Sequence, residues 1–136
     1  MKRCVFFILL TTIILGSCQK DGPVGPPDLL YKRWHLTQTR TLDSNVWQST
    51  DTDAYYTVEY QSDGTLVYQR NSVMTQANCC APTTFNRQRE TINYREWKFC
   101  SNAYCATTKL VTINQLTETV LELNDGYRIS QYEAAR

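Results

Sequence analysis

The chain has 136 residues and a mass of 15.8 kDa, which is enough for one domain and too little for two. Its hydrophobic residues (42%) and charged residues (20%) are ordinary for a globular protein, and they exclude a wholly disordered, a collagen-like or a multi-span membrane chain. The net charge of +1 creates no strong field for nucleic acid, so we expect no nucleic-acid partner.

Residues 1–17 have the organisation of an export signal. Lys2 and Arg3 give a positive start, and the apolar run over 5–15 suits a secretory signal but is too short to span a bilayer as a helix. The run ends in Leu15-Gly16-Ser17-Cys18, which resembles the bacterial lipobox. The alternative is an ordinary secretory signal that happens to precede a cysteine.

The lipobox resemblance implies that the chain is cut before Cys18 and that this thiol carries lipid. Each buried methylene contributes about 0.8 kcal/mol, so several acyl chains form a lasting membrane anchor. Gln19 stands where an aspartate would mark inner-membrane retention in enteric bacteria, and Lys20-Asp21 loosely resembles the export signal of Bacteroidota surface lipoproteins. We expect an outer-membrane lipoprotein whose membrane partner is reached through Cys18, on the periplasmic or the cell-surface face.

Residues 18–28 are dominated by glycine, proline and charge, and they predict a flexible tether. The folded domain is expected over residues 29–136. It is rich in Thr, Tyr, Val, Trp and Ile, the residue types that suit a pleated surface, and apolar residues recur with a period of two. These patterns predict antiparallel β-structure.

The first expected strand, residues 34–42, places Trp34, Leu36, Gln38, Arg40 and Leu42 on one face. Strands over 55–60 and 65–70 flank the tight turn Ser62-Asp63-Gly64 and form the clearest hairpin. The segment 75–89 lacks a period and contains Pro82, so we expect a long loop there. The remaining expected strands are 90–99, 107–114, 119–123 and 127–132, with a turn at Asn124-Asp125-Gly126.

Seven or eight short strands in a domain of this size predict a small all-β, antiparallel, up-and-down barrel, with a small β-sandwich as the alternative. The segment over 29–133 resembles the short lipocalin-like domains of Bacteroidota lipoproteins. The resemblance rests on Trp34-His35-Leu36, Val46-Trp47, the stretch 56–66, the paired cysteines and the stretch 113–123. It implies a lipocalin-like barrel with a tryptophan plug, although Lys32-Arg33-Trp34 stands where classical lipocalins have Gly-x-Trp.

Four cysteines belong to the expected domain: Cys79, Cys80, Cys100 and Cys105. Export through an oxidising compartment favours disulfides, and four cysteines allow three pairings. We favour the two pairings that join 79–80 to 100 and 105, without deciding between them, over a strained bridge between neighbours. A zinc site fits poorly because its ligands usually come as spaced Cys-x-x-Cys pairs, so we expect no metal.

Catalytic constellations are not recognisable in the sequence, and we expect neither an enzyme nor a cofactor. The single histidine, His35, sits in a strand without a nucleophile elbow, and Asp51 and Asp53 occupy a polar loop without the pattern of an EF-hand. Aromatic residues are abundant, and some must fill the interior of a small barrel. Those that could instead contact a small ligand are Trp34, Tyr56, Tyr60, Tyr68, Tyr94 and Trp97.

The expected function is that of a lipid-anchored, non-enzymatic envelope protein that binds a small apolar ligand or a protein partner at the open end of the barrel. Two alternatives remain. One is an accessory or structural lipoprotein of an envelope complex. The other is an enzyme inhibitor that uses the loop at 75–89.

Overall fold

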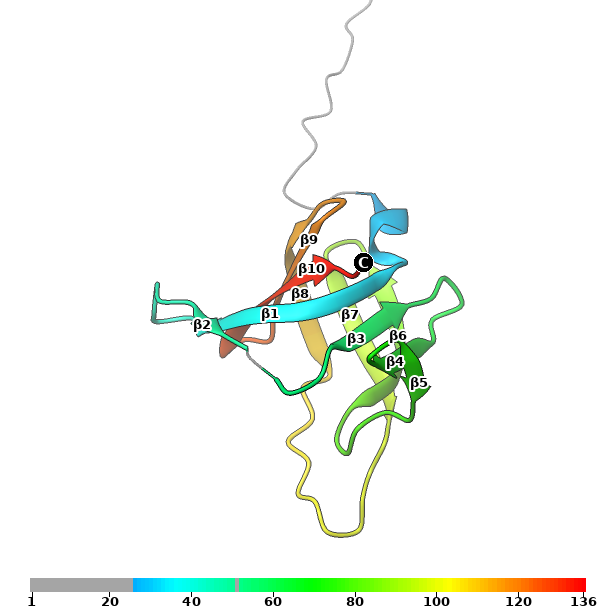
Figure 1. The fold of residues 1–136 in the computed structure, drawn as a ribbon. Coiled ribbons are helices and arrows are strands. Elements are labelled where there is room, and N and C mark those ends of the chain that lie inside the picture. The colour runs from blue at the N-terminus through cyan, green and yellow to red at the C-terminus, as the bar shows by residue number, and fades with distance from the viewer. Residues whose placement is uncertain (1–25, 51) are drawn as a thin grey trace, which may run out of the picture.

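One antiparallel β-sheet contains almost all of the regular secondary structure in the computed structural model (Figure 1). The structure describes residues 26–50 and 52–136. The expected signal peptide, Cys18 and the tether up to residue 25 lie outside the described residues, as does Asp51. The strands are β1 (Arg33–Thr41), β2 (Gln48–Ser49), β3 (Tyr56–Tyr60), β4 (Leu66–Arg70), β5 (Val73–Thr75), β6 (Pro82–Gln88), β7 (Thr91–Trp97), β8 (Leu110–Leu116), β9 (Val120–Asn124) and β10 (Arg128–Ala134).

A short 3₁₀ helix, η1 (Pro27–Leu30), precedes the sheet and overlaps the boundary expected between tether and domain. Proline at its first position is favourable there, because that residue needs no backbone N–H donor. Leu30 at the end of η1 is fully buried and fixes the helix to the sheet. Among the described residues, no helix is long and apolar enough to cross a membrane.

The strands follow the order β5-β4-β3-β1-β10-β9-β8-β7-β6, and β2 pairs with the outer part of β1. Every pairing is antiparallel, so the expected all-β class is confirmed. The sheet curls until its two ends approach each other near the β3–β4 turn. There the N–H of Phe85 donates to the carbonyl of Gly64 over 2.8 Å, and a single bridge joins Thr65 to Thr84.

The predicted β3–β4 hairpin is confirmed. Gly64 has a φ of +88°, a conformation that residues with a Cβ rarely adopt, and the carboxylate of Asp63 accepts the N–H of Thr65 over 2.8 Å. The second predicted turn is also confirmed, because Gly126 has a φ of +92° between β9 and β10. Aspartate and glycine predicted both turns because the aspartate carboxylate accepts a backbone N–H of the turn and glycine adopts a positive φ without a steric clash.

The loop expected over 75–89 is wrong for its second half, which forms β6. Pro82 is the first residue of this strand, and β6 ends the strand order, so the missing N–H interrupts no ladder. Phe85 is the one fully buried residue of β6, and the other positions are half-buried or exposed. The alternation that reveals a strand in a sequence is therefore absent. The short strands β2 and β5 were not predicted either, and both are fully exposed.

The expected face of the first strand is correct for Trp34 and Leu36 and wrong beyond them. The register between β1 and β10 shifts between Leu36 and Gln38, because a β-bulge inserts one residue there. Leu36 lies opposite Tyr132, whereas Gln38 lies opposite Gln131, which belongs to the other face of β10. The bulge therefore turns Gln38 and Arg40 away from the face that carries Trp34.

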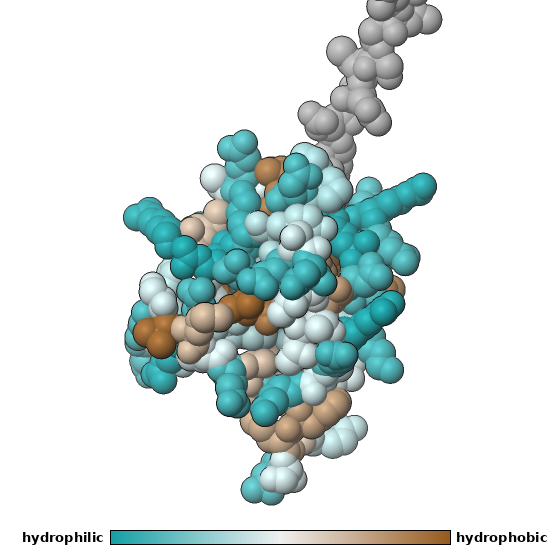
Figure 2. Space-filling model, turned by 90° about the vertical axis from the view of Figure 1, so that its right-hand side faces the viewer, coloured by the Kyte–Doolittle hydropathy of each residue, from teal (hydrophilic) through white to brown (hydrophobic). Residues whose placement is uncertain are grey.

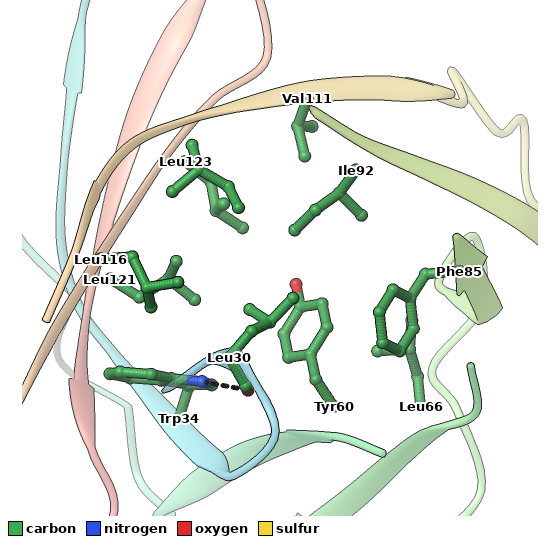
Figure 3. Packing of buried hydrophobic residues seen from close by; sticks show 11 residues of the cluster. Leu30, Trp34, Tyr60, Leu66, Phe85, Ile92, Val111, Leu116, Leu121 and Leu123 are labelled. Carbon is green, nitrogen blue, oxygen red and sulfur yellow. Dashed lines mark hydrogen bonds between the residues drawn. The ribbon is translucent and has the colours of Figure 1, made fainter. Parts of the chain in front are cut away.

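The core lies inside the curve of the sheet (Figure 3). Trp34 is fully buried, and its indole N–H donates to the carbonyl of Leu30 over 3.0 Å, so η1 and β1 together fill one end of the interior. Burial of each large apolar side chain contributes roughly 1.5–3 kcal/mol. The cluster consists of Leu30, Trp34, Tyr60, Leu66, Phe85, Ile92, Val111, Ile113, Leu116, Leu121 and Leu123.

Candidate ligand-binding site

Four tyrosines from different strands gather in the interior: Tyr60 from β3, Tyr68 from β4, Tyr94 from β7 and Tyr132 from β10. The hydroxyls of Tyr60 and Tyr94 are hydrogen-bonded over 2.6 Å. The hydroxyl of Tyr68 donates to the carbonyl of Pro82 over 2.7 Å and so connects β4 to β6 across the gap between them. The tyrosine hydroxyls thus form a small polar cluster inside an otherwise apolar interior.

Burial raises the pKa of all four phenols above the ordinary value of 10.0, because the charged phenolate loses its hydration. The phenols also act on one another: Tyr132 raises the pKa of Tyr60, Tyr68 and Tyr94, as expected for groups that share one space. All four therefore remain neutral at physiological pH. Each keeps a hydroxyl proton to donate and lone pairs that accept.

A pocket of about 190 Å³ opens on one side of Tyr132, and we call it the Trp34 pocket. Most of its walls are apolar or aromatic, and they come from β1, β3, β4 and β10. It is lined by Trp34, Leu36, Tyr56, Thr57, Val58, Tyr68, Gln69, Asn78 and Tyr132.

A second pocket of about 200 Å³ opens on the other side of Tyr132, and we call it the Trp97 pocket. The rings of Tyr94 and Trp97 meet edge to face, with centroids 6.2 Å apart. Arg128 and Asp125 form an ion pair of 3.8 Å among its polar lining residues. The pocket is lined by Tyr94, Trp97, Ala106, Thr108, Val111, Leu123, Asp125, Arg128, Ser130 and Tyr132.

Disulfides fix the loops that border both pockets. Cys79 pairs with Cys100 and Cys80 with Cys105, with Cα atoms 5.6 Å and 5.1 Å apart, so the predicted link between the two cysteine pairs is confirmed. Asn78, next to Cys79, lines the Trp34 pocket, and Ala106, next to Cys105, lines the Trp97 pocket. Two segments with no regular structure of their own are thereby fixed against each other beside the pockets.

The structure places most of the aromatic residues predicted as ligand contacts around this interior. Trp34, Tyr56 and Tyr68 line one pocket, and Tyr94 and Trp97 line the other. Tyr60 is 2% exposed and lies behind them, hydrogen-bonded to Tyr94. The sequence argument missed Tyr132, which borders both pockets. The sequence feature that could have indicated Tyr132 is its alternation with Arg128 and Ser130 along β10, because all three residues line the Trp97 pocket.

A wider, more polar pocket of about 280 Å³ lies beside η1 and the β3–β4 turn, lined among others by Tyr31, Asp63, Arg87 and Arg95. Burial lowers the pKa of Arg87, whose guanidinium donates to the carbonyls of Pro27 and Arg89. The contact with Pro27 holds η1 against β6. Arg87, the charged residue of this pocket that reaches η1, therefore serves to pack η1 on the sheet, and we do not include this pocket in the candidate site.

His35 lies apart from both tyrosine-lined pockets. Its Nδ1 bonds to the carbonyl of Tyr56 over 2.8 Å, and its ring stacks on Tyr55 with centroids 4.1 Å apart. Within residues 26–50 and 52–136, no three His, Cys, Asp or Glu side chains are grouped closely enough to hold a metal ion.

The arrangement can enclose a small molecule between aromatic walls and offer it neutral hydroxyl groups. Its parts come from strands far apart in the sequence, and the curved sheet brings them together. In comparisons with family models, curated proteins and solved structures, no match to the chain was found.

Proposed function

We propose that this protein is a lipid-anchored, non-enzymatic envelope protein whose lipocalin-like, up-and-down barrel binds a small, largely apolar ligand. The observation that carries the proposal is the pair of pockets that share Tyr132: the walls of the Trp34 pocket are mostly apolar or aromatic, and the Trp97 pocket combines Tyr94, Trp97 and Tyr132 with a polar lining. Pockets with apolar walls and a few polar groups are the usual form of small-molecule sites.

The strand connections support a barrel. In chain order, β1, β3 and β4 pair in succession, β6 through β10 pair in succession, and β10 returns to pair with β1. This is the order of an up-and-down barrel, interrupted between β4 and β6. The single bridge from Thr65 to Thr84 and the bond from Tyr68 to Pro82 span that interruption. That one strand order connects all the strands of this path supports the proposal of a barrel.

The pocket volumes favour a ligand of about one ring. Drug-sized ligands usually occupy about 300–1,000 Å³, and each pocket here is smaller. An apolar cavity of about 150 Å³ is nevertheless enough to bind benzene. A substituted single ring therefore fits either pocket.

The position of the pockets suits a protein anchored at its N-terminal end. The described chain enters beside η1, and the loop over 98–109 lies at the opposite end of the molecule (Figure 1). Leu30 fills the interior near η1, whereas Asn78 and Ala106, next to disulfide-bonded cysteines, border the pockets. An anchor at the N-terminal end would therefore leave the loops that border the pockets uncovered.

Binding can be tested with ligand-observed NMR, using acetophenone and ethylbenzene as probes. Thr108→Trp places a large side chain at the edge of the Trp97 pocket and is expected to abolish saturation transfer to probes bound there. Thr112→Trp, at an exposed position of β8, is the matched control. Absence of transfer to either probe with the unmodified protein would contradict the proposal.

The anchor has a separate test. Cys18→Ala removes the acceptor thiol and is expected to abolish palmitate labelling and to leave the protein in the soluble fraction of the cell. The matched control is Cys4→Ala, which alters a cysteine of the expected signal peptide. Continued labelling of the Cys18 variant would refute the anchor.

A protein partner is the second candidate, and one observation favours it. Tyr104 is 98% exposed on the loop between Cys100 and Cys105, whose ends are both held by disulfides. Aromatic side chains on pre-organised loops are frequent anchors of protein interfaces. A photo-crosslinking residue at position 104 should then capture a discrete partner in cells, and one at position 127, where Tyr127 is 84% exposed, should not.

A further inference from the structure

We infer that the Trp97 pocket selects an uncharged ring compound carrying a hydrogen-bond acceptor, such as an aromatic ketone or aldehyde. This inference rests on the proposed function, because it names the chemical class that the binding site takes.

Tyr60 and Tyr94 together hold one proton more than the hydrogen bond between them uses. Tyr60 and Tyr94 share one hydrogen bond, so one of the two hydroxyls donates to the other and the second keeps its own proton. The contacts of the described residues give this proton no acceptor. Tyr68 differs, because its proton is used by the carbonyl of Pro82. A carbonyl oxygen of a ligand beside Tyr94 would supply the missing acceptor.

The charges around the pocket disfavour an ionised ligand. Arg128 and Asp125 are its charged lining residues, and they pair with each other over 3.8 Å. The Arg128 side chain is 58% exposed, so it lies at the rim and not among the phenols. The interior phenols are neutral, since burial raises their pKa values. A carboxylate or an ammonium group would lose hydration here without gaining a buried counter-charge.

The aromatic walls favour a flat ring. Tyr94 and Trp97 stand at 78° to each other, so they offer a ligand one ring face and one ring edge. Val111 and Leu123 add apolar surface, and both are about 5% exposed in the unliganded protein. The volume of about 200 Å³ suits a single substituted ring.

Four probes of similar size test the inference: acetophenone, ethylbenzene, benzoate and benzylamine, each titrated into the purified domain by NMR. One neutral hydrogen bond corresponds to about a tenfold change in affinity. Acetophenone should therefore bind about tenfold more tightly than ethylbenzene, and the two ions should bind more weakly than acetophenone.

Two variants identify the donor. Tyr94→Phe removes the hydroxyl beside the pocket, so acetophenone should fall to the affinity of ethylbenzene while ethylbenzene stays within about twofold. Tyr60→Phe leaves the proton of Tyr94 free, so the preference for acetophenone should persist. A purely structural role for the Tyr60–Tyr94 bond would instead make the two variants behave alike. Tyr127→Phe, at an 84% exposed position that lines neither pocket, is the control for purification and handling.

The outcomes separate the two proposals. If no probe binds, the proposed function fails. If ethylbenzene binds as tightly as acetophenone, or if either ion binds more tightly, the binding site stands and the inference about its ligand is wrong. An unchanged preference for acetophenone in Tyr94→Phe would also overturn the inference.

Discussion

Gly64 is the residue whose substitution should most directly weaken the contact between the two ends of the curved sheet. Its carbonyl accepts the N–H of Phe85 over 2.8 Å, and a Cβ built on Gly64 would lie 2.8 Å from the carbonyl oxygen of Phe85. That oxygen belongs to the backbone of β6 and cannot move aside as a flexible side chain would. Gly64→Ala must therefore push β6 away from the β3–β4 turn.

Gly126 provides a matched control for the backbone strain. Its φ of +92° is close to the +88° of Gly64, but a Cβ there would meet nothing within 4 Å. A positive φ costs a residue with a Cβ about 1–2 kcal/mol, and the lower entropy of the unfolded chain returns about 0.4–1 kcal/mol. Gly126→Ala should therefore lower the free energy of unfolding by about 1 kcal/mol.

Gly64→Ala should lose the same amount and, in addition, the hydrogen bond to Phe85, which contributes about 0.5–1.5 kcal/mol. The expected total is about 1.5–2.5 kcal/mol. Urea unfolding followed by circular dichroism gives both free energies, and hydrogen exchange at the Phe85 amide reports the contact itself. Equal destabilisation of the two variants, with Phe85 protected as before, would refute the argument that β6 is held at this point.

Three further predictions concern the rest of the interior. Replacing all four cysteines, Cys79, Cys80, Cys100 and Cys105, by Ser should lower the free energy of unfolding by roughly 3 kcal/mol, because each bridge closes nearly the same loop of 21 to 25 residues and neither would then close it. A urea midpoint unchanged from that of the oxidised parent would contradict this. The free energy of unfolding should fall as the pH rises above about 10, because unfolded tyrosines ionise there while the folded state keeps four phenols protonated, those of Tyr60, Tyr68, Tyr94 and Tyr132. A spectrophotometric titration in which all nine tyrosines ionise together before unfolding would contradict this. Trp34→Phe should lower the free energy of unfolding by about 1–3 kcal/mol, because it leaves the Leu30 carbonyl unpaired in the core. Trp47→Phe, at a ring that stacks on Arg40 outside the core, should lower it by less than about 1 kcal/mol. Equal losses for the two variants in urea unfolding would contradict the role of Trp34 in closing the interior.

The turns and the main strands were predictable because their signals are local. Asp63-Gly64 and Asp125-Gly126 carry residues that satisfy their own turn hydrogen bonds and tolerate a positive φ. Strand β6 was not predictable, since its position at the end of the strand order leaves most of its residues partly exposed and erases the alternation. The bulge after Leu36 is likewise invisible, because it depends on the register with β10, almost 100 residues further along the chain.

The candidate site was predictable in its residue types and not in its arrangement. Aromatic residues at alternating strand positions indicated interior side chains, but the sequence did not show which of them share a pocket. Tyr132 was missed because its importance comes from lying between two pockets, which depends on the pairing of β10 with both β1 and β9. The disulfide partners remained open for a similar reason: Cys79 and Cys80 are neighbours, so loop length hardly distinguishes the two cross-linked pairings.

The pairing of β1 with β10 has a consequence for the timing of folding. Trp34 lies opposite Ala134, and the N–H of Ala135 donates to the carbonyl of Arg33, so the first long strand is completed by nearly the last residues of the chain. Contacts between such distant segments slow folding, because a long loop must close before they form. During synthesis β1 must wait, unpaired on this side, until β10 has emerged. Removal of residues 128–136 should therefore leave β1 with an exposed, aggregation-prone edge.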